Sequence, residues 1–280
     1  MRIDALVVVK GGGDLATGAA FRLCRAGFRV IVTEIPRPTC VRRTVSFAEA
    51  VYAGEVMVEG VKARLAGSIR EAERMLDTGV APVLVDPAAE CVRKLRPSVL
   101  VDGIMAKTNT GTCLGDAPVV VALGPGFTAG VDCHAVVETN RGHDLGRAIM
   151  DGPASADTGV PGTIEGEAAR RILRAPVSGA LCARRAIGAI VHAGDVVAEV
   201  DGHAVPAQIG GVLRGLLHDG LAVTAGTKVG DVDPRAKPEH CATISDKSLA
   251  VGGGVLEAVM ALLPLELAAT PPERSGSPGS

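Results

Sequence analysis

The 280 residues carry a formal net charge of -2 and are 47% hydrophobic but only 2% aromatic, with one Tyr and no Trp. This composition excludes a general binder of nucleic acids or anionic membranes, because such proteins need a concentrated positive field. The scarcity of aromatic side chains also argues against stacking on bases. We therefore expect a small molecule or a protein as the partner, and a chain of this length suits two domains.

The sequence lacks the marks of export and of membrane insertion. No apolar run reaches the roughly 18 residues of a membrane span, and the first residues lack a basic segment followed by an apolar core, so we expect a cytoplasmic protein. Seven cysteines are scattered without a Cys-x-x-Cys pair, which favours reduced thiols over a zinc site or a disulfide framework. Residues 264–280 are rich in Pro, Ser and Gly and are predicted to form a disordered tail.

The first motif is VVVKGGGDLATGAAFRL, residues 7–23, in which three glycines follow an apolar run. Residues 5–9 form the continuous apolar stretch of a strand buried on both faces, and residues 14–26 carry apolar side chains at helical spacing. A second apolar run, FRVIVTE, ends at Glu34. Strand, glycine turn, helix and a second strand ending in an acid are the parts of a dinucleotide-binding site.

In such a site the glycine backbone approaches a pyrophosphate, the helix N-terminus offers N–H donors and the acid binds ribose hydroxyls. The spacing here, G-x-G-x-x-x-T-G, differs from the strict form, and a purely structural turn is the alternative. The candidate ligand-binding residues of this motif are Gly11, Gly12, Gly13, Asp14, Thr17 and Glu34.

Strands continue to alternate with helices beyond this motif. We predict helices over residues 68–77 and 88–95, and strands over residues 81–86 and 98–102. The alternation predicts an α/β fold with a Rossmann-like, doubly wound parallel sheet.

Ligands of such sheets bind beyond the carboxyl ends of the strands, where the glycine turn, Glu34, Asp86 and Asp102 would converge. The loop AKTNTGT, residues 106–112, follows Asp102 directly. It adds Lys107 and Asn109 as candidate contacts to a phosphate or polar ligand, although a solvated loop has the same composition.

A polar segment, ALGPGFTAGVDCHAVVETNRGHDLGR (residues 122–147), places His134, Glu138, Arg141 and His143 within ten residues. A metal site would use both histidines and the glutamate, but AVVET is predicted to be a strand whose period of two does not include His143. We therefore favour a polar or anionic ligand over a metal, and structural hydrogen bonding stays open. Arg141 joins the candidate ligand-binding residues, and His134, Glu138 and His143 are the candidates for acid–base catalysis.

The second half contains an internal repeat between residues 175–200 and 207–232, offset by 32 positions. The matched pairs are Gly179 and Gly211, Gly188 and Gly220, Gly194 and Gly226, Leu181 and Leu213, Val191 and Val223, and Val200 and Val232. Turn glycines that recur in step with apolar positions predict two copies of one β unit facing each other. The arrangement resembles the barrel-sandwich of biotinyl and lipoyl carrier domains.

Those carriers attach their cofactor to a lysine at the hairpin between the two halves. The joining segment here, DGHAVP (residues 201–206), has no lysine, so we expect a docking or lid module, with His203 at its tip. The expected division is a Rossmann-like cofactor-binding domain over residues 1–165, the β domain over residues 170–235 and a helical segment over residues 236–263. That last helix is expected to return to the first domain.

Several motifs in order resemble one family across about residues 3–262, the YqeB family of the selenium-dependent molybdenum hydroxylase system. They are KGGGDLATG, KTNTGT, the polar segment, TGVPG (residues 158–162) and the stretch from RAPVSG to GDVDPR. The Rossmann-like part is similar to that of the XdhC proteins, which handle the molybdenum cofactor. The resemblance implies an accessory protein for maturation of a molybdenum hydroxylase, with that enzyme or its cofactor machinery as partner.

The bacterial cofactor is often a pterin dinucleotide, and its pyrophosphate is a group that a glycine turn at a helix N-terminus accommodates. The expected ligand is therefore the molybdenum cofactor or NAD(P), between which the sequence does not choose. Direct handling of selenium has no support in the residues, because no thiol lies in an activating pair, and the roles of Cys113 and Cys133 beside the polar segment stay open.

Two other functions are compatible with the sequence. One is an NAD(P)-dependent oxidoreductase that uses His134 or His143 as its acid or base. The other is a non-catalytic adaptor that docks a partner enzyme and leaves the glycine turn empty. Whether a reaction is catalysed and whether the chain forms a homo-oligomer also stay open.

Overall fold

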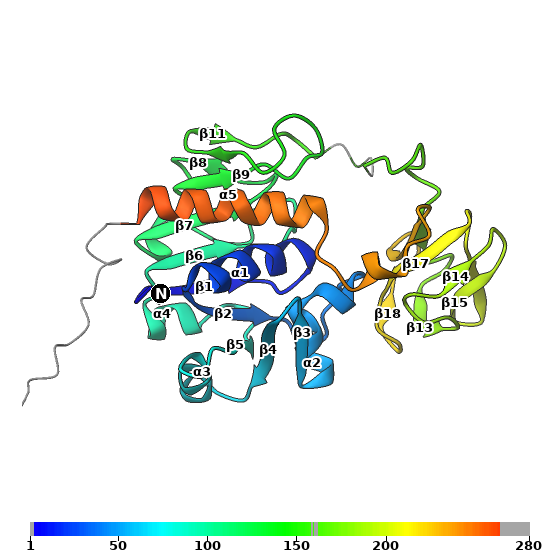
Figure 1. Ribbon diagram of the computed structural model, residues 1–280, viewed down its shortest axis with the longest axis horizontal. Helices are drawn as coiled ribbons and strands as arrows, with labels where there is room; N and C mark the ends of the chain where they lie inside the picture. The colour runs from blue at the N-terminus through cyan, green and yellow to red at the C-terminus, as the bar shows by residue number, and fades with distance from the viewer. Residues whose placement is uncertain (1–2, 158, 160–161, 264–280) are drawn as a thin grey trace, which may run out of the picture.

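A computed structural model of the protein describes residues 3–157, 159 and 162–263. Figure 1 shows an α/β body and a smaller β lobe at one end. We call residues 3–157 together with helix α5 the sheet lobe, and residues 172–233 the β module. The predicted disordered tail lies outside the described residues, as do Thr158, Val160 and Pro161 of TGVPG.

The sheet lobe is built on a nine-stranded sheet in the order β10-β9-β7-β6-β1-β2-β5-β4-β3. All neighbours from β9 to β4 run parallel, while β3 and β10 are antiparallel edge strands. The predicted α/β class with a mainly parallel sheet is confirmed. The strands are β1 (Leu6–Lys10), β2 (Arg29–Glu34), β3 (Glu55–Val58), β4 (Val61–Ala66), β5 (Ala81–Val85), β6 (Val99–Asp102), β7 (Val119–Leu123), β9 (Ala135–Val137) and β10 (Ala148–Ile149).

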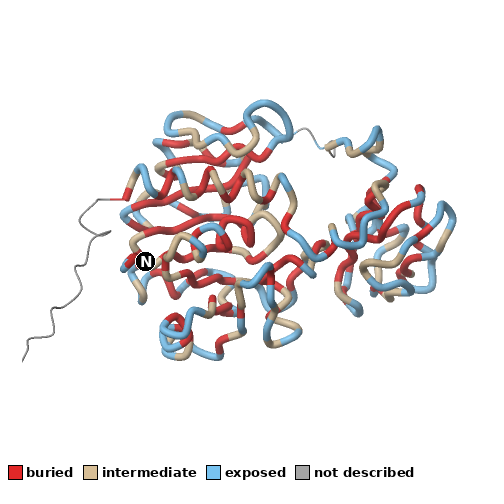
Figure 2. The backbone as a smooth tube through the Cα atoms, in the orientation of Figure 1, coloured by how far each residue is buried: buried red, intermediate tan, exposed pale blue. Residues whose placement is uncertain are grey.

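Helices cover both faces of this sheet, which explains the continuous apolar runs of its strands. Along β1, Val7 and Val9 pack on the face covered by α1 and α5, whereas Val8 packs on the opposite face with α3 and α4. Figure 2 shows the resulting band of buried strands. The helices are α1 (Asp14–Ala26), α2 (Ala50–Ala53), α3 (Ile69–Leu76), α4 (Cys91–Leu95) and α5 (Asp246–Leu262), and the short 3-10 turns are η1 (Arg43–Val45), η2 (Phe47–Glu49), η3 (Leu114–Asp116) and η4 (Pro238–Cys241).

The predicted helix over residues 88–95 was too long by its first turn. The carboxylate of Asp86 accepts hydrogen bonds from the backbone N–H groups of Glu90 and Cys91, at 3.0 and 2.8 Å, and α4 begins only at Cys91. By contrast, α3 begins where the sequence indicates, because the Ser68 hydroxyl caps it by accepting from the Glu71 N–H. A small two-stranded sheet, β8 (Thr128–Ala129) and β11 (Gly152–Pro153), was not predicted.

Helix α5 returns from the end of the chain to pack against α1, as expected (Figure 1). The helices approach closely because glycines meet at the contact. A Cβ on Gly18 would lie 2.2 Å from the Ser248 hydroxyl, and one on Gly252 would lie 2.4 Å from the Gly18 carbonyl oxygen. The Ser248 hydroxyl donates to the Asp14 carbonyl at 2.8 Å. Gly18 of the glycine motif therefore serves helix packing.

The β module contains two four-stranded sheets, ordered β12-β19-β17-β14 and β16-β15-β13-β18. The 32-residue offset relates β13 to β17, β14 to β18 and β15 to β19, and each copy pairs one strand with the other copy. Gly179 pairs with Val223, and the symmetry-related pair is Gly211 with Val191. The strands are β12 (Ile172–Arg174), β13 (Gly179–Ala183), β14 (Ile190–Val191), β15 (Val196–Val200), β16 (His203–Pro206), β17 (Gly211–Leu216), β18 (Ala222–Val223) and β19 (Lys228–Asp233).

The turn glycines of the repeat share their conformations. Gly188 and its match Gly220 have φ values of +95° and +73°, and Gly194 and Gly226 have φ values of +94° and +82°. The predicted pair of facing β units is thus present, with matched turns and matched strand register. Its tip holds no lysine, and His203 there is exposed, with Nδ1 3.1 Å from the Asp201 carbonyl oxygen.

Candidate ligand-binding cavity

A cavity of about 220 Å³ lies at the carboxyl ends of β1, β2, β5 and β6. It is lined by Lys10, Gly11, Gly13, Thr33, Glu34, Ile35, Thr39, Cys40, Asp86, Pro87, Gly103 and Ile104. This is the edge at which the sequence places the glycine turn, Glu34 and Asp86. A second hollow of about 270 Å³, lined by residues near Gly27 and Val80, lies toward the other end of β2 and adjoins no helix N-terminus.

The three glycines of the turn have different roles. Gly11 has φ +84°, and a Cβ there would lie 3.1 Å from the Gly103 carbonyl oxygen. A Cβ on Gly12 would lie 2.8 Å from the Ala48 backbone nitrogen, whereas a Cβ on Gly13 would meet no atom within 4 Å. Gly13 is also the N-cap of α1 and has no side chain to cap it. The first two glycines therefore allow close chain packing, and Gly13 presents an uncapped helix N-terminus to the cavity.

Glu34 lies against the glycine turn. Its Oε2 accepts a hydrogen bond from the Gly12 N–H at 2.8 Å, and its Oε1 accepts from the Ile35 N–H at 2.8 Å. A carboxylate has about four acceptor positions, so these two bonds leave capacity for ligand hydroxyls. The carboxylate both holds the turn and lines the cavity.

Lys10 is a site residue that the sequence analysis missed. It ends β1, is 8% exposed and lines the cavity. Its Nζ donates to the Thr112 hydroxyl at 2.6 Å and lies 3.2 Å from Oδ2 of Asp102, and the Thr112 hydroxyl donates to the same oxygen at 2.6 Å. The sequence could have indicated Lys10, because it is an ionisable residue that follows directly on a wholly apolar run.

Asp14 and Thr17 support the turn instead of lining the cavity. The buried Thr17 hydroxyl donates to the Gly12 carbonyl at 3.0 Å and accepts from the Phe47 N–H at 2.9 Å. Asp14 pairs with Arg42 at 3.3 Å. Of the six candidates in the glycine motif, the structure brings Gly11, Gly13 and Glu34 to the cavity wall.

The 106–112 loop contributes Thr112 through the Lys10 contact, and its two predicted candidates lie away from the cavity wall. Lys107 is exposed and pairs with Asp157 at 2.7 Å. The Asn109 side chain donates to the Thr112 carbonyl and accepts from the Thr112 N–H, both at 2.8 Å. Asn109 therefore holds Thr112, whose hydroxyl accepts the hydrogen bond from Lys10.

The polar segment does not form one site. His134 lies before β9, and its Nδ1 accepts from the Val120 N–H at 3.0 Å. Glu138 lies after β9 and accepts from the N–H groups of Asn140 and Ser155 at 2.6 and 2.7 Å. Burial raises the pKa of Glu138, but these hydrogen bonds outweigh it and lower the pKa. Structural hydrogen bonding accounts for both side chains.

The other two members of that segment lie at the surface. Arg141 binds both carboxylate oxygens of Asp246 at 2.8 Å, and His143 is exposed. Within residues 3–157, 159 and 162–263, no three His, Cys, Asp or Glu side chains are placed to hold a metal ion. The two histidines and the glutamate considered as metal ligands from the sequence are therefore not brought together.

The two cysteines beside the polar segment lie in different environments. The exposed Cys113 thiol donates to Asp116 at 3.3 Å, and burial raises the pKa of Cys133 to about 12. Cys40 lines the cavity beside the Ser46 hydroxyl, at 2.9 Å, and burial raises its pKa to about 11. Cys40 and Cys133 are accordingly thiols near neutral pH.

No protein-family model matches the chain. Over 258 residues it is 52% identical to the uncharacterized protein YqeB of Escherichia coli (strain K12), an alignment that covers 92% of this chain and 48% of that protein. The chain thus spans about half the length of the curated relative that it matches. None of the helices among the described residues has both the length and the apolar character to cross a bilayer.

Two solved structures align weakly over most of the chain. They are an ectoine utilization protein from Ruegeria pomeroyi (11% identity, 83% of this chain and 86% of that chain, TM-score 0.25) and an aspartoacylase family protein from Mesorhizobium loti (13% identity, 81% and 84%, TM-score 0.25). TM-scores this low support no argument about fold or function. What the comparisons show is a chain similar over nearly its whole length to YqeB of Escherichia coli.

Proposed function

We propose that the chain binds a phosphate group of a dinucleotide-type ligand in the cavity at the glycine turn, and that it acts as an accessory protein in maturation of a molybdenum hydroxylase. The observation that carries the first part is the open face of Gly13 at the uncapped N-terminus of α1, in a cavity that Lys10 also lines. A helix N-terminus carries about half a positive charge, and the Lys10 ammonium, although paired with Asp102, offers a further cationic donor at the cavity wall.

The remaining wall suits the rest of a nucleotide. Glu34 offers acceptor capacity for ribose hydroxyls, as the acid after the second strand of a Rossmann-like sheet does. Ile35 and Ile104 line the cavity and are 40% and 39% exposed, which offers apolar contact to a planar ring. About 220 Å³ is less than the roughly 300 to 1,000 Å³ of a pocket for a drug-sized ligand, so much of a dinucleotide would extend past these side chains.

The role in maturation rests on the resemblance to the YqeB and XdhC proteins and on the similarity to YqeB. The molybdenum cofactor in its dinucleotide form and NAD(P) both carry the pyrophosphate that the turn suits. The β module, barrel-sandwich-like and without a lysine at its tip, would dock the partner enzyme. The oxidoreductase alternative loses support because neither His134 nor His143 lines the cavity.

The test is Gly13→Asp, measured by isothermal titration calorimetry with NAD(H), NADP(H), CTP and molybdenum cofactor extracts. A Cβ at Gly13 meets nothing within 4 Å, so the fold should survive while a negative charge occupies the phosphate position. We expect affinity to fall about 100-fold or more, a loss of roughly 3 kcal/mol.

Gly115→Asp is the matched control, because a Cβ there also meets open space. It should leave affinity unchanged, and both variants should keep the wild-type melting temperature. Equal affinity of Gly13→Asp and wild type for every ligand that binds would refute the phosphate cradle. Turnover of a nicotinamide cofactor would favour the oxidoreductase.

A further inference from the structure

A single segment of the chain contacts both the cavity and the β module. Residues 35–44 follow β2, and we call them the wall segment. Ile35, Thr39 and Cys40 of this segment line the cavity at the glycine turn. The next residue, Val41, packs against the apolar core of the β module. The cavity lining and an anchor of the β module are therefore neighbours in the chain.

Hydrogen bonds tie the wall segment to β17 and to the turn that follows it. The Leu216 N–H donates to the Val41 carbonyl at 2.9 Å, and Nε of Arg43 donates to the Leu216 carbonyl at 3.1 Å. Nη2 of Arg37 donates to the Gly220 carbonyl at 2.7 Å. The wall segment therefore moves together with β17 unless these bonds break.

The contact between Val41 and β17 is close because Gly215 has no side chain. A Cβ on Gly215 would lie 2.7 Å from Cγ1 of Val41 and 2.8 Å from its carbonyl oxygen. The third nearest atom, at 3.1 Å, is the Val41 carbonyl carbon. Contacts this short are not tolerated in a packed interior, so a side chain at position 215 would displace either Val41 or β17.

The repeat shows why glycine is needed at this position. The matched position in the other copy, 32 residues earlier, is Ala183 of β13. Gly215 does not have a positive φ, so its backbone also suits alanine. A Cβ is therefore compatible with the β unit itself, and the close approach of Val41 is what requires glycine here.

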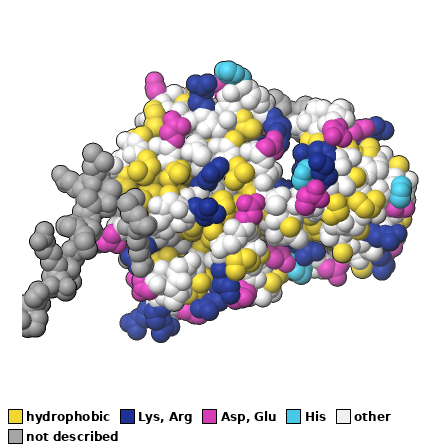
Figure 3. Space-filling model, in the orientation of Figure 1, with side chains coloured by type: hydrophobic (Ala, Val, Ile, Leu, Met, Phe, Trp, Pro, Cys, Tyr) yellow, Lys and Arg dark blue, Asp and Glu magenta, His cyan; other side chains and the backbone are white. Residues whose placement is uncertain are grey.

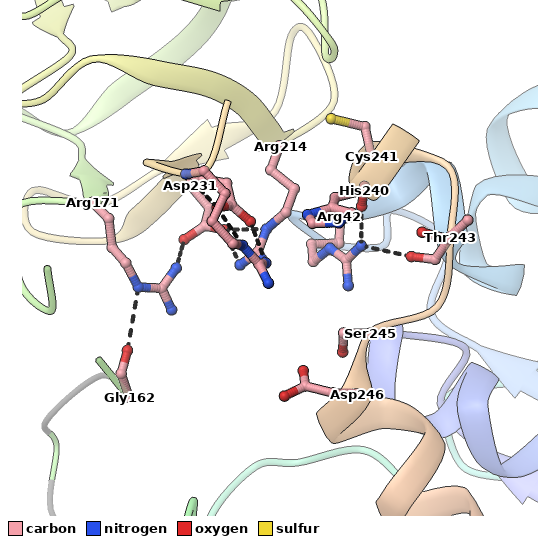
Figure 4. A network of polar contacts seen from close by, with 12 residues as sticks. Arg42, Gly162, Arg171, Arg214, Asp231, His240, Cys241, Thr243, Ser245 and Asp246 are labelled. Carbon is pink, nitrogen blue, oxygen red and sulfur yellow. Dashed lines mark hydrogen bonds and ion pairs between the residues drawn. The ribbon is translucent and has the colours of Figure 1, made fainter. Parts of the chain in front are cut away.

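Arg42 fastens the wall segment to the sheet lobe. It is 7% exposed, and its Nη2 donates to the carbonyls of His240 and Thr243 at 2.9 and 3.0 Å (Figure 4). Its Nη1 lies 3.3 Å from Oδ2 of Asp14, the first residue of α1. The residue after Val41 is thus bound to the helix whose N-terminus meets the cavity.

Other contacts hold the β module at the junction between the two lobes. Tyr52 of α2 stacks on His218, with ring centroids 4.0 Å apart, and Nε2 of His218 lies 3.8 Å from Oε1 of Glu49. Figure 3 shows charged side chains of both signs on the surface where the lobes meet. The β module is thus held beside the wall segment by side chains as well as by backbone bonds.

We infer that the β module positions the cavity wall through Val41, and that a ligand in the cavity and the docked β module stabilise each other. Val41 is a positioning residue, because it contacts the β module and lies outside the cavity lining. Displacing it moves Cys40, its neighbour in the chain, and with it one side of the cavity. The effect on ligands rests on the proposed function, whereas the link between β17 and the wall does not.

Such coupling is reciprocal. Whatever factor the docked β module contributes to ligand affinity, a bound ligand contributes to docking of the β module. A partner enzyme that binds the β module would therefore distinguish a filled cavity from an empty one.

The first experiment needs no ligand and measures how fast iodoacetamide alkylates Cys40 in the full chain. Gly215→Ala should raise this rate about tenfold, because breaking the Val41 contact opens the wall beside a half-buried thiol. Peptide mass spectrometry resolves the individual cysteines. Cys133, which is 0% exposed, reports any unfolding of the whole sheet lobe and should keep its slow rate.

Two further variants complete this measurement. Gly210→Ala is the matched control, because a Cβ there would make only an ordinary contact of 3.7 Å, and it should leave the Cys40 rate unchanged. Val41→Ala removes the apolar anchor without adding a side chain and should raise the Cys40 rate as Gly215→Ala does. If the Cys40 rate kept its wild-type ratio to the Cys133 rate in both test variants, the inference would be overturned.

The second experiment measures the affinity for inorganic pyrophosphate by calorimetry. Gly215→Ala should bind it about tenfold more weakly than the wild type, and Gly210→Ala should bind it equally. Equal affinity in Gly215→Ala would overturn the coupling while leaving the proposed phosphate site intact. If the wild type did not bind pyrophosphate, the proposed function would fail, and the Cys40 rates would still decide whether the β module positions the wall.

The third experiment follows the coupling in the opposite direction, by NMR hydrogen exchange of single amides. Pyrophosphate in the cavity should slow exchange at Leu216, whose N–H donates to Val41 and lies outside the cavity lining. Arg184 is the matched residue of the other copy, and its N–H donates to the Val197 carbonyl at 2.9 Å. Exchange at Arg184 should not change. Slowing at both amides, or at neither, would contradict the inference.

Discussion

The two copies of the repeat in the β module share a backbone but differ in what surrounds them. In the outward copy, β13 is only partly buried, and its Cys182 pairs with Glu199 of β15 in register. In the copy that meets the sheet lobe, β17 is buried along its whole length, and the matching positions hold Arg214 and Asp231. Lys228 likewise stands where the outward copy has Val196.

This comparison separates what the fold requires from what the junction requires. Shared features such as the turn glycines and the buried Leu181 and Leu213 are needed to build the unit. Charges present in one copy alone are not needed for the backbone, because the other copy folds without them. These charges lie where the β module meets the sheet lobe, and the cost of removing them from water is offset there by pairing with one another.

The largest difference in stability is expected between Asp231→Asn and Glu199→Gln, which change matched positions of the two copies. Asp231 is 1% exposed between Arg171 and Arg214, and removing one partner of a buried ion pair costs about 3 to 5 kcal/mol. Glu199 pairs with Arg184 at the surface, and its loss should leave stability unchanged. Urea unfolding of both variants measures this difference, and similar midpoints would contradict it.

A second pair of matched variants, Gly211→Ala and Gly179→Ala, should show a smaller difference in stability than the first pair. A Cβ at Gly211 would lie 2.3 Å from the backbone carbonyl oxygen of Asp233, which cannot move without disturbing β19. At Gly179 it would lie 2.3 Å from the side chain of Asp201, which can rotate away at the surface. We expect losses of about 3 and about 1 kcal/mol, respectively. Melting temperatures would show the order, and a larger loss at Gly179 would mean that the tip is rigid.

The smallest effect concerns acid pH and Asp233. Burial raises the pKa of this carboxyl, but hydrogen bonds from Arg235 and the nearby Arg214 outweigh it and lower the pKa to about 2. The folded-state pKa lies below the unfolded value of about 3.9. The ionised Asp233 carboxyl therefore contributes fully to folding stability above about pH 4, and this contribution disappears as the pH falls toward 2. It amounts to about 2 kcal/mol.

Wild type and Asp233→Asn are the pair to compare for this effect, by urea unfolding at pH 6 and pH 3. The difference in unfolding free energy between them should be smaller at pH 3. A constant difference would show that the Asp233 carboxyl contributes through its packing and not through its charge.

Local patterns predicted the glycine turn and α1 well, since a strand, three glycines and helical spacing all lie within 23 residues. The Lys10 contact escaped because Thr112 lies 102 positions away in sequence and no periodicity links them. Asp14 and Thr17 were expected to bind ligand, but residues of those types also pair or cap within a fold. Which partner such a side chain selects depends on tertiary contacts.

The repeat was the most informative long-range signal, because an offset of 32 fixes which strands are equivalent. It could not show which copy faces the sheet lobe. That depends on contacts such as the Leu216 N–H, which donates to the Val41 carbonyl at 2.9 Å. Val41 belongs to the segment after Glu34, and nothing in its composition distinguishes it from an ordinary loop.

The return of α5 to α1 has a consequence for how the protein is made. Ala16, Ala19, Ala20 and Leu23 of α1 are buried, and α5 covers that helix from the far end of the chain. During synthesis this apolar surface emerges more than 200 residues before the helix that covers it. Contacts so distant in sequence form slowly, and surfaces left open meanwhile tend to aggregate. The burial of this face of α1 therefore has to wait until α5 has been synthesised.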